Sequence, residues 1–198
     1  MTDDANIRDK LLKSARKMFA QKGFEGTSVR QICEDAGVNA ALISYYFGGK
    51  DKIFSELFNN FFPMEQMKDI LKQPLSPDEG VRLLVRGVLQ FRMNNPELVK
   101  IIQFEILTNS ERVPIIREHA YPVWEALRQW LQEGKELGIF KFRSLQTALG
   151  LIISVLLYPL SNPYWTGLFG EELPAGSTFI EDTTDFVLRG LYYERLEG

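Results

Sequence analysis

The sequence predicts an all-α protein of about nine helices, and three observations carry that prediction. Apolar residues recur at helical spacing in successive segments, and no alternating strand pattern competes with them. Capping residues such as Ser, Thr and Asn precede several of these segments, and Gly or Pro follows them. With 198 residues, 45% of them hydrophobic, the chain is long enough for a small module beside a larger one. We expect two domains, at residues 1–50 and 51–198.

The first fifty residues carry the pattern of three helices in close succession. We predict helices over about residues 7–22, 29–36 and 40–47, with Gly37 ending the second and Asn39 capping the third. Because only a short turn separates the second from the third, these two helices must cross steeply, as in a helix-turn-helix. Gly37 is expected to take a positive φ at that turn.

Composition excludes several classes of site. The single cysteine, Cys33, excludes an internal disulfide and a cysteine metal cluster, and we interpret it as a packing residue rather than a redox sensor. His119 is the single histidine, interpreted as a surface or satisfied group, and it nominates no metal site. Since the chain also lacks a glycine-rich phosphate loop and metal-ligand spacing, we expect neither a cofactor nor an enzyme.

Helical patterns continue beyond the first fifty residues. We predict further helices over about residues 51–62, 78–94, 96–109, 113–137, 144–160 and 177–196. A linker is expected at 74–77 (Pro-Leu-Ser-Pro), and a loop at 161–176. The most apolar stretch falls short of the roughly 20 residues that a bilayer requires. The start of the chain lacks the pattern of a secretory signal, so we expect a cytoplasmic protein without membrane contact.

Charge is distributed unevenly along the chain. The overall formal charge is -3, but residues 1–52 carry +2 and the remainder -5. Between Arg8 and Lys22 six basic residues face only Asp9. A basic helix face gives modest support for phosphate binding, although such a face is more often simply solvated.

An ordered series of motif residues carries a family resemblance. The series reads Phe19-Ala-Gln-Lys-Gly-Phe-Glu-Gly-Thr27-Ser28-Val-Arg30-Gln-Ile-Cys-Glu-Asp-Ala-Gly37-Val38, then Ile43-Ser-Tyr45-Tyr46-Phe47-Gly-Gly-Lys50-Asp-Lys-Ile-Phe54. Over residues 7–58 it resembles the DNA-binding domain of the TetR/AcrR family of transcriptional regulators. The resemblance implies a ligand-responsive repressor that binds a palindromic double-stranded DNA operator as a homodimer.

The same resemblance implies which residues contact DNA. Those expected to enter the major groove are Asn39, Ala40, Ala41, Ser44 and Tyr45. Those expected to hold phosphates are Thr27, Ser28, Tyr46 and Lys50. Simple N-capping is the alternative role for the Thr-Ser pair, and packing is the alternative for the two tyrosines.

The sequence departs from the commoner family pattern just before the tyrosine pair. A Lys or Arg, a Gly and a Thr often stand there, whereas this chain has Ala40, Ala41 and Leu42. We interpret Leu42 as core. Base recognition is then expected to depend on thymine methyl contacts from the two alanines, on Ser44 or Asn39, and on DNA shape.

The remainder of the chain is expected to dimerise and to sense a small molecule. By resemblance, the dimer interface is formed by helices 145–160 and 179–196, although ordinary core packing explains the same apolar stripes. The helix that begins after Lys50 is the expected lever between effector and DNA. Aromatic and Met side chains suit an apolar or amphipathic effector, and core packing is again the alternative; the candidate pocket residues are Phe58, Phe61, Phe62, Met67, Phe91, Phe104, Tyr121, Trp124 and Tyr158.

One rival interpretation keeps the fold and changes the function. A DNA-binding protein of this fold could organise or coat DNA without sensing a ligand. Its preference among DNA sequences would be small at matched salt, whereas a regulator prefers its operators by a large ratio.

Overall fold

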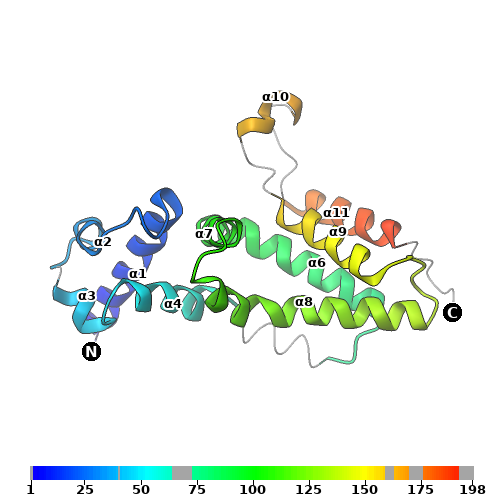
Figure 1. Cartoon of the computed structure of the whole chain (residues 1–198), viewed down its shortest axis with the longest axis horizontal. Coiled ribbons are helices and arrows are strands. Elements are labelled where there is room, and N and C mark those ends of the chain that lie inside the picture. Colours follow the sequence, from blue (N-terminus) through cyan, green and yellow to red (C-terminus); the bar gives the residue numbers. More distant parts are fainter. Residues whose placement is uncertain (1, 40, 64–72, 159–162, 170–175, 192–198) are drawn as a thin grey trace. The chain divides into compact units, whose positions relative to one another are not determined.

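The computed structural model describes residues 2–39, 41–63, 73–158, 163–169 and 176–191, and within these ranges all regular secondary structure is helical (Figure 1). The elements are α1 Thr2–Lys22, α2 Val29–Ala36, α3 Ala41–Tyr46, α4 Lys50–Phe61, α6 Pro77–Asn94, α7 Pro96–Leu107, α8 Val113–Glu136, α9 Leu145–Leu157, the 3-10 helix η1 Pro163–Trp165, α10 Thr166–Phe169 and α11 Gly176–Gly190. The predicted all-α class is confirmed. None of the helices in these ranges is long and apolar enough to cross a membrane.

The chain divides into two compact units. The first, which we call the head unit, comprises residues 1–68 and 95–121; the second, the body unit, comprises residues 69–94 and 122–198. The head unit therefore holds α1 to α4, α7 and the start of α8, whereas the rest of α8 belongs to the body unit. Compactness thus groups α4 and α7 with the three N-terminal helices.

An aromatic cluster forms the core of the head unit. Phe19 of α1 lies 5.2 Å from Phe24 and 6.0 Å from Phe54, ring centre to ring centre, and Phe54 lies 5.3 Å from Phe58 on α4. Aliphatic side chains from every helix of the unit are also buried, including Leu11, Ile32, Ile43, Ile53, Leu57, Leu98, Ile101 and Ile116. α1 packs against α2, α4 and α7, and the buried Ile43 side chain anchors α3 in the core.

The body unit is a helical layer built on α6. α6 packs against α11 and α9 through a buried stripe that includes Val81, Val85 and Leu89. Glycines allow two close contacts: a Cβ on Gly80 would collide with the Trp130 ring, and one on Gly134 would collide with Phe140. These contacts explain why both positions lack a side chain.

One detail differs from the sequence-based expectations. The predicted loop at 161–176 contains η1 and α10; proline is well tolerated in a first helical turn, and the Tyr164 and Trp165 rings pack edge to face at 4.7 Å. The helix predicted over about residues 113–137 is confirmed as α8, which continues through Pro122. The helix loses one backbone donor there, at the residue where the body unit's share of α8 begins.

Candidate nucleic-acid interface

The helix α2 has both of its ends fixed by its own residues. Ser28 is the N-cap: its hydroxyl accepts from the Gln31 N–H at 3.2 Å, and the Gln31 side chain accepts from the Ser28 N–H at 2.9 Å. Gly37 ends the helix at φ 69°, in the left-handed region that glycine adopts without strain. The predicted positive φ is confirmed. This turn directs the chain immediately into α3.

The short helix α3 presents one face to the core and one to solvent. Ile43 is fully buried, whereas Ala41, Ser44 and Tyr45 are exposed, Tyr45 by 78%. Asn39 stands before the helix, and its side-chain oxygen accepts from the Ala41 N–H at 2.9 Å. We call the exposed set Asn39, Ala41, Ser44 and Tyr45 the reading face. Ala40, which the sequence also predicts to contact DNA, lies outside the described residues.

The residues predicted to hold phosphates differ in exposure. Ser28 is exposed, and Tyr46 is half-buried with its ring 4.9 Å from that of Tyr45. Thr27 is buried, and its hydroxyl donates to the Gly23 carbonyl at 2.7 Å. The Lys50 ammonium donates to the carbonyls of Phe24 and Thr27 at 2.9 and 3.0 Å. The Thr27 and Lys50 side chains therefore hold the turn before α2 from within.

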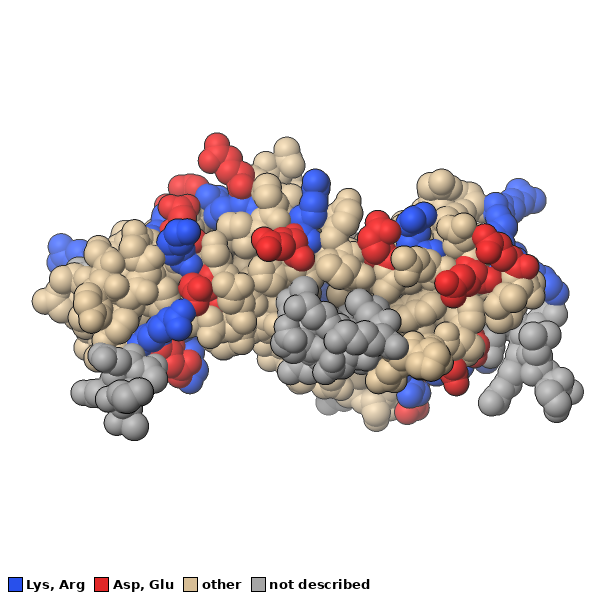
Figure 2. Space-filling view, turned by 90° about the horizontal axis from the view of Figure 1, so that it is seen from below, with Lys and Arg blue, Asp and Glu red and all other residues tan. Residues whose placement is uncertain are grey.

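Intramolecular ion pairs occupy much of the basic face of α1. The pairs join Arg8 to Glu56, Lys13 to Asp9, Arg16 to Glu97 and Lys17 to Asp35. On the face drawn in Figure 2, basic and acidic side chains are interspersed rather than gathered into one basic patch. Phosphate contacts by this unit would therefore depend strongly on hydroxyls and on the free N–H groups at the start of α2.

Two titratable groups on α2 have shifted pKa values. Hydrogen bonds from Lys17 and Ser14 on α1 hold the pKa of the Asp35 carboxyl below its ordinary value. Burial raises the pKa of the Cys33 thiol, with the Glu34 charge adding to it. Cys33 is 2% exposed, which confirms its predicted role as a packing residue.

His119 is also a satisfied group, as expected. Its Nδ1 lies 2.9 Å from the Ile115 carbonyl oxygen, and its Nε2 lies 3.2 Å from Asn59 Oδ1. The Phe58 and Phe62 rings pack against it. The imidazole thus belongs to the packing between α4 and α8, and the described residues hold no cluster of three His, Cys, Asp or Glu groups suited to a metal.

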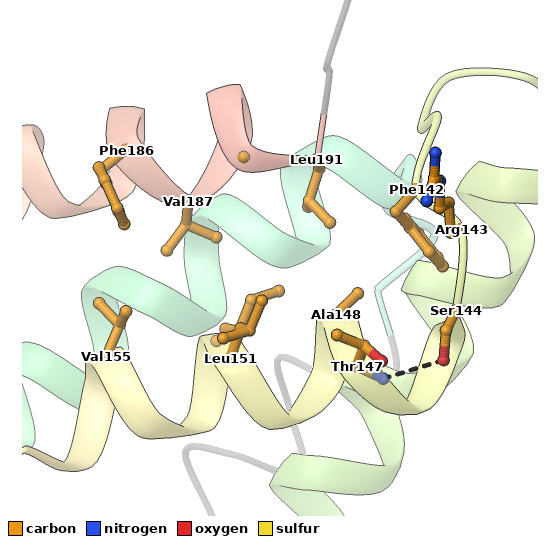
Figure 3. Close-up of a pocket in the computed structure, with 12 residues that line it drawn as sticks. Phe142, Arg143, Ser144, Thr147, Ala148, Leu151, Val155, Phe186, Val187 and Leu191 are labelled. Carbon is orange, nitrogen blue, oxygen red and sulfur yellow. Dashed lines mark hydrogen bonds between the residues drawn. The ribbon is translucent and has the colours of Figure 1, made fainter.

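A mostly apolar groove lies on the body unit, with a volume of about 580 Å³. Figure 3 shows Leu151 and Val155 of α9 on one side of it and Phe186 and Val187 of α11 on the other. Leu151 is 63% exposed and Phe186 67% exposed, so the groove opens to solvent. The full lining is Phe142, Arg143, Ser144, Thr147, Ala148, Leu151, Ile152, Val155, Phe186, Val187, Gly190 and Leu191.

None of the predicted effector residues lines this groove. Phe58, Phe61, Phe62, Phe104 and Tyr121 belong to the head unit; Phe91, Trp124 and Tyr158 belong to the body unit. Met67 lies outside the described residues. Of the set, Phe58 is fully buried, whereas Phe104, Tyr121 and Tyr158 are 52%, 51% and 42% exposed. Their role in effector binding stays a prediction.

Comparison with known proteins identifies the family of this chain. Residues 11–57 match the model described as bacterial regulatory proteins of the tetR family, and residues 77–178 match the tetracyclin repressor-like C-terminal domain. The HTH-type transcriptional repressor NicS of Pseudomonas putida is 30% identical over 197 residues, covering 93% of this chain and 92% of that protein. AcnR of Corynebacterium glutamicum, also an HTH-type transcriptional repressor, is 27% identical, with 90% and 92% covered.

Solved structures agree with the sequence relatives. The crystal structure of HlyIIR, a hemolysin II transcriptional regulator, superposes with a TM-score of 0.78 at 27% identity, over 96% of this chain and 99% of that one. Both comparisons cover more than nine tenths of this chain, so they include the α2–α3 segment and the helical remainder. The chain therefore belongs to the TetR family of bacterial regulatory proteins, and it is a DNA-binding transcriptional regulator.

Proposed function

We propose that the protein is a repressor that binds a palindromic operator as a homodimer and releases it when a small apolar or amphipathic molecule binds. The observation that carries this proposal is the reading face, which is solvent-exposed on a helix whose other side is locked into the core. A helix of this kind fits the major groove, where each base pair presents a distinct pattern of groups.

We assign base contacts to the reading face together with Ala40, and phosphate contacts to Ser28 and Tyr46. Ala41 and Ser44 are small, so α3 can approach the base edges closely, and the Ala41 methyl suits a thymine methyl. Because Ala40 and Ala41 carry no hydrogen-bonding side chain, DNA shape is expected to contribute to the preference. Thr27 and Lys50 support the same site by fixing the turn before Ser28.

A matched pair of tyrosine variants tests this assignment. Tyr45 is 78% exposed on α3, and Tyr164 is 80% exposed in the body unit. We expect Tyr45→Ala to lower affinity for DNA duplexes that the wild type selects from a random pool by about 10-fold or more, in line with the loss of a specific contact. Tyr164→Ala should leave this affinity unchanged. Equal effects of the two substitutions would contradict the assignment.

The apolar groove supports the proposed dimer. The outward stripe Thr147, Leu151 and Val155 on α9 repeats every fourth residue, so α9 carries a second apolar face besides the one it buries. An exposed apolar groove on two neighbouring helices is typical of a surface that a partner covers. We propose a second copy of the chain as that partner, because a two-fold axis there pairs α9 and α11 with themselves and closes the assembly.

Charge placed in the groove tests the dimer. We expect Leu151→Glu to convert the dimer to a monomer and to abolish high-affinity operator binding, because each half-site alone offers few contacts. Leu137→Glu is the control, since Leu137 is 66% exposed in the same unit but outside the groove. Light scattering after size exclusion measures the mass. A Leu151→Glu protein that remains dimeric would refute this interface.

The proposed effector is a small apolar or amphipathic molecule. The aromatic side chains of the candidate pocket residues, among them Phe58 and Tyr158, predict a ligand with a large apolar surface. A panel of apolar and amphipathic molecules, screened for release of the selected duplex, tests this expectation. Release by at least one of them at constant salt supports ligand response. A protein that also shows no sequence preference would instead be the architectural DNA-binding alternative.

A further inference from the structure

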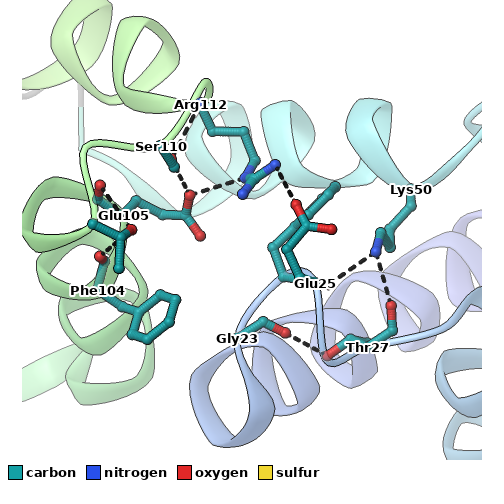
Figure 4. Close-up of polar contacts among 10 residues, drawn as sticks. Gly23, Glu25, Thr27, Lys50, Phe104, Glu105, Ser110 and Arg112 are labelled. Atoms are coloured by element: carbon teal, nitrogen blue, oxygen red, sulfur yellow. Dashed lines mark hydrogen bonds and ion pairs between the residues drawn. The ribbon is translucent and has the colours of Figure 1, made fainter.

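A polar cluster joins the α7–α8 connection to the turn that precedes α2 (Figure 4). Its members are Glu105 on α7, Ser110 and Arg112 in the connection, and Phe24 and Glu25 in the turn. We call this cluster the clasp. All five residues belong to the head unit.

The inner half of the clasp is a buried ion pair. Glu105 is 1% exposed, and its carboxylate accepts from the Arg112 Nε at 2.9 Å and from the Ser110 hydroxyl. The Ser110 hydroxyl in turn accepts from the backbone N–H of Arg112 at 3.2 Å. If Arg112 turned away, the buried Glu105 carboxylate would lose its charged partner, which is energetically costly. These contacts therefore hold the Arg112 side chain in one direction.

The outer half of the clasp lies on the turn before α2. The Arg112 guanidinium lies 3.9 Å from the centre of the Phe24 ring, and it reaches the Glu25 carboxylate at 3.1 Å. Lys50 contacts the same ring from the start of α4, at 4.1 Å. Stacking and a charge pair together define the position of the turn more narrowly than apolar packing alone.

The clasp contacts the segment that directly precedes α2, and α2 leads into α3, which carries most of the reading face. Gly23 and Thr27 are joined by the Thr27 hydroxyl, and Ser28 follows as the N-cap of α2. At the other end, Arg112 directly precedes the first residue of α8, whose Val113–Tyr121 portion lies in the head unit and whose remainder lies in the body unit. Pro122 removes a backbone donor where the two portions meet.

We propose that Arg112 is a positioning residue: through Phe24 and Glu25 it fixes how the helix-turn-helix is mounted on α8, and thereby selects the half-site spacing that the dimer accepts. Arg112 itself is expected to contact no DNA base. The inference rests on the proposed dimeric, palindrome-reading function. The expected lever between effector and DNA is α4. The clasp would be a second connection, through which movement of α8 reaches the reading face.

Half-site spacing is the measurement that distinguishes positioning from simple stabilisation. A substitution that only destabilises the head unit lowers affinity for all duplexes alike, whereas a loosened mount changes which spacings are accepted. The test therefore uses the half-site that the wild type selects from random DNA. A pool of duplexes carries this half-site in two inverted copies, separated by every spacing over about one helical turn.

Two variants and one control make the test. Arg112→Lys keeps the charge but loses the planar group that serves Glu105, Glu25 and Phe24 together. Glu25→Gln removes only the outer pair, at a side chain that is 80% exposed, so it leaves the fold intact and carries the test if Arg112→Lys does not fold. Arg128→Lys is the control, because Arg128 lies on α8, which follows Arg112 directly, in an exposed pair with Glu125.

We expect the wild type and Arg128→Lys to prefer one spacing. Both clasp variants should lower that preference, Arg112→Lys by about five-fold, while the half-site sequence stays the same. Folded clasp variants with the wild-type spacing distribution would overturn the inference and leave the proposed function standing. A wild type that selects no palindrome would overturn the proposed function, and this inference with it.

Discussion

The ammonium of Lys50 lies 4.1 Å from the centre of the Phe24 ring and donates to the carbonyl oxygens of Phe24 and Thr27. A side chain at the start of α4 thereby satisfies two carbonyls of the turn that precedes α2. By motif alone, this lysine is expected on a phosphate. Its contacts favour a structural contribution to the same DNA site.

We expect Lys50→Met to lower the free energy of unfolding by about 1–3 kcal/mol, because two partly buried carbonyls lose a charged donor. Urea denaturation measures this change. The salt dependence of DNA binding separates the two roles: each phosphate contact adds roughly 0.9 to the slope of log K against log salt. An unchanged slope in the folded variant supports the structural role, and a slope reduced by about that amount would contradict it.

Ser28 has two roles that different substitutions separate. Ser28→Ala removes the hydroxyl that caps α2 and should cost about 1 kcal/mol of stability. Ser28→Asp retains a good cap, so stability is expected to stay near that of the wild type. The added negative charge faces the proposed phosphate site, and DNA affinity should fall steeply. If Ser28→Asp binds DNA as the wild type does, the phosphate assignment is wrong.

Two glycines of α6 should respond in opposite directions to the same change. Gly80→Ala places a Cβ against the Trp130 ring and is expected to destabilise the body unit. Gly87→Ala meets no atom within 4 Å and should stabilise α6 by about 0.5–1 kcal/mol through higher helix propensity. Thermal unfolding of both variants tests the packing; similar shifts in Tm of the same sign would contradict it.

The Asp35 carboxyl links stability to pH. Hydrogen bonds from Lys17 and Ser14 lower its pKa from the ordinary value of 3.8, so it stabilises the folded state while it is ionised. That contribution is fully present above the ordinary value and is lost as the pH falls through the lowered pKa. We expect Asp35→Asn to be less stable than the wild type at neutral pH, with the difference shrinking below about pH 4. A difference in stability that stays constant at acid pH would argue against the stabilising contacts of Asp35 with Lys17 and Ser14.

The parts of the fold that the sequence predicts are those with local causes. The N-cap at Ser28, the left-handed turn at Gly37 and the cap at Asn39 each depend on residues within three positions, and the structure confirms the helices that they delimit. For residues 161–176 the sequence predicts a loop, because proline and glycine usually indicate turns, whereas the structure has the short helices η1 and α10 there.

Long-range contacts are what the sequence does not predict. Arg112 reaches Phe24 across most of the head unit's sequence, and nothing near either residue indicates the partner. The inward direction of Lys50 has the same origin, since its acceptors lie on another turn. For the same reason, an exposed aromatic such as Phe104 cannot be assigned to a pocket from spacing alone.

Selection of bound duplexes from a random pool, by the purified protein at near-physiological salt, tests the central claim most directly. We predict recovery of an inverted repeat whose half-sites lie roughly 34–36 Å apart, or a multiple of that, and loss of its enrichment with Tyr45→Ala. Binding that persists across the pool with no enriched motif would contradict a sequence-specific dimeric repressor.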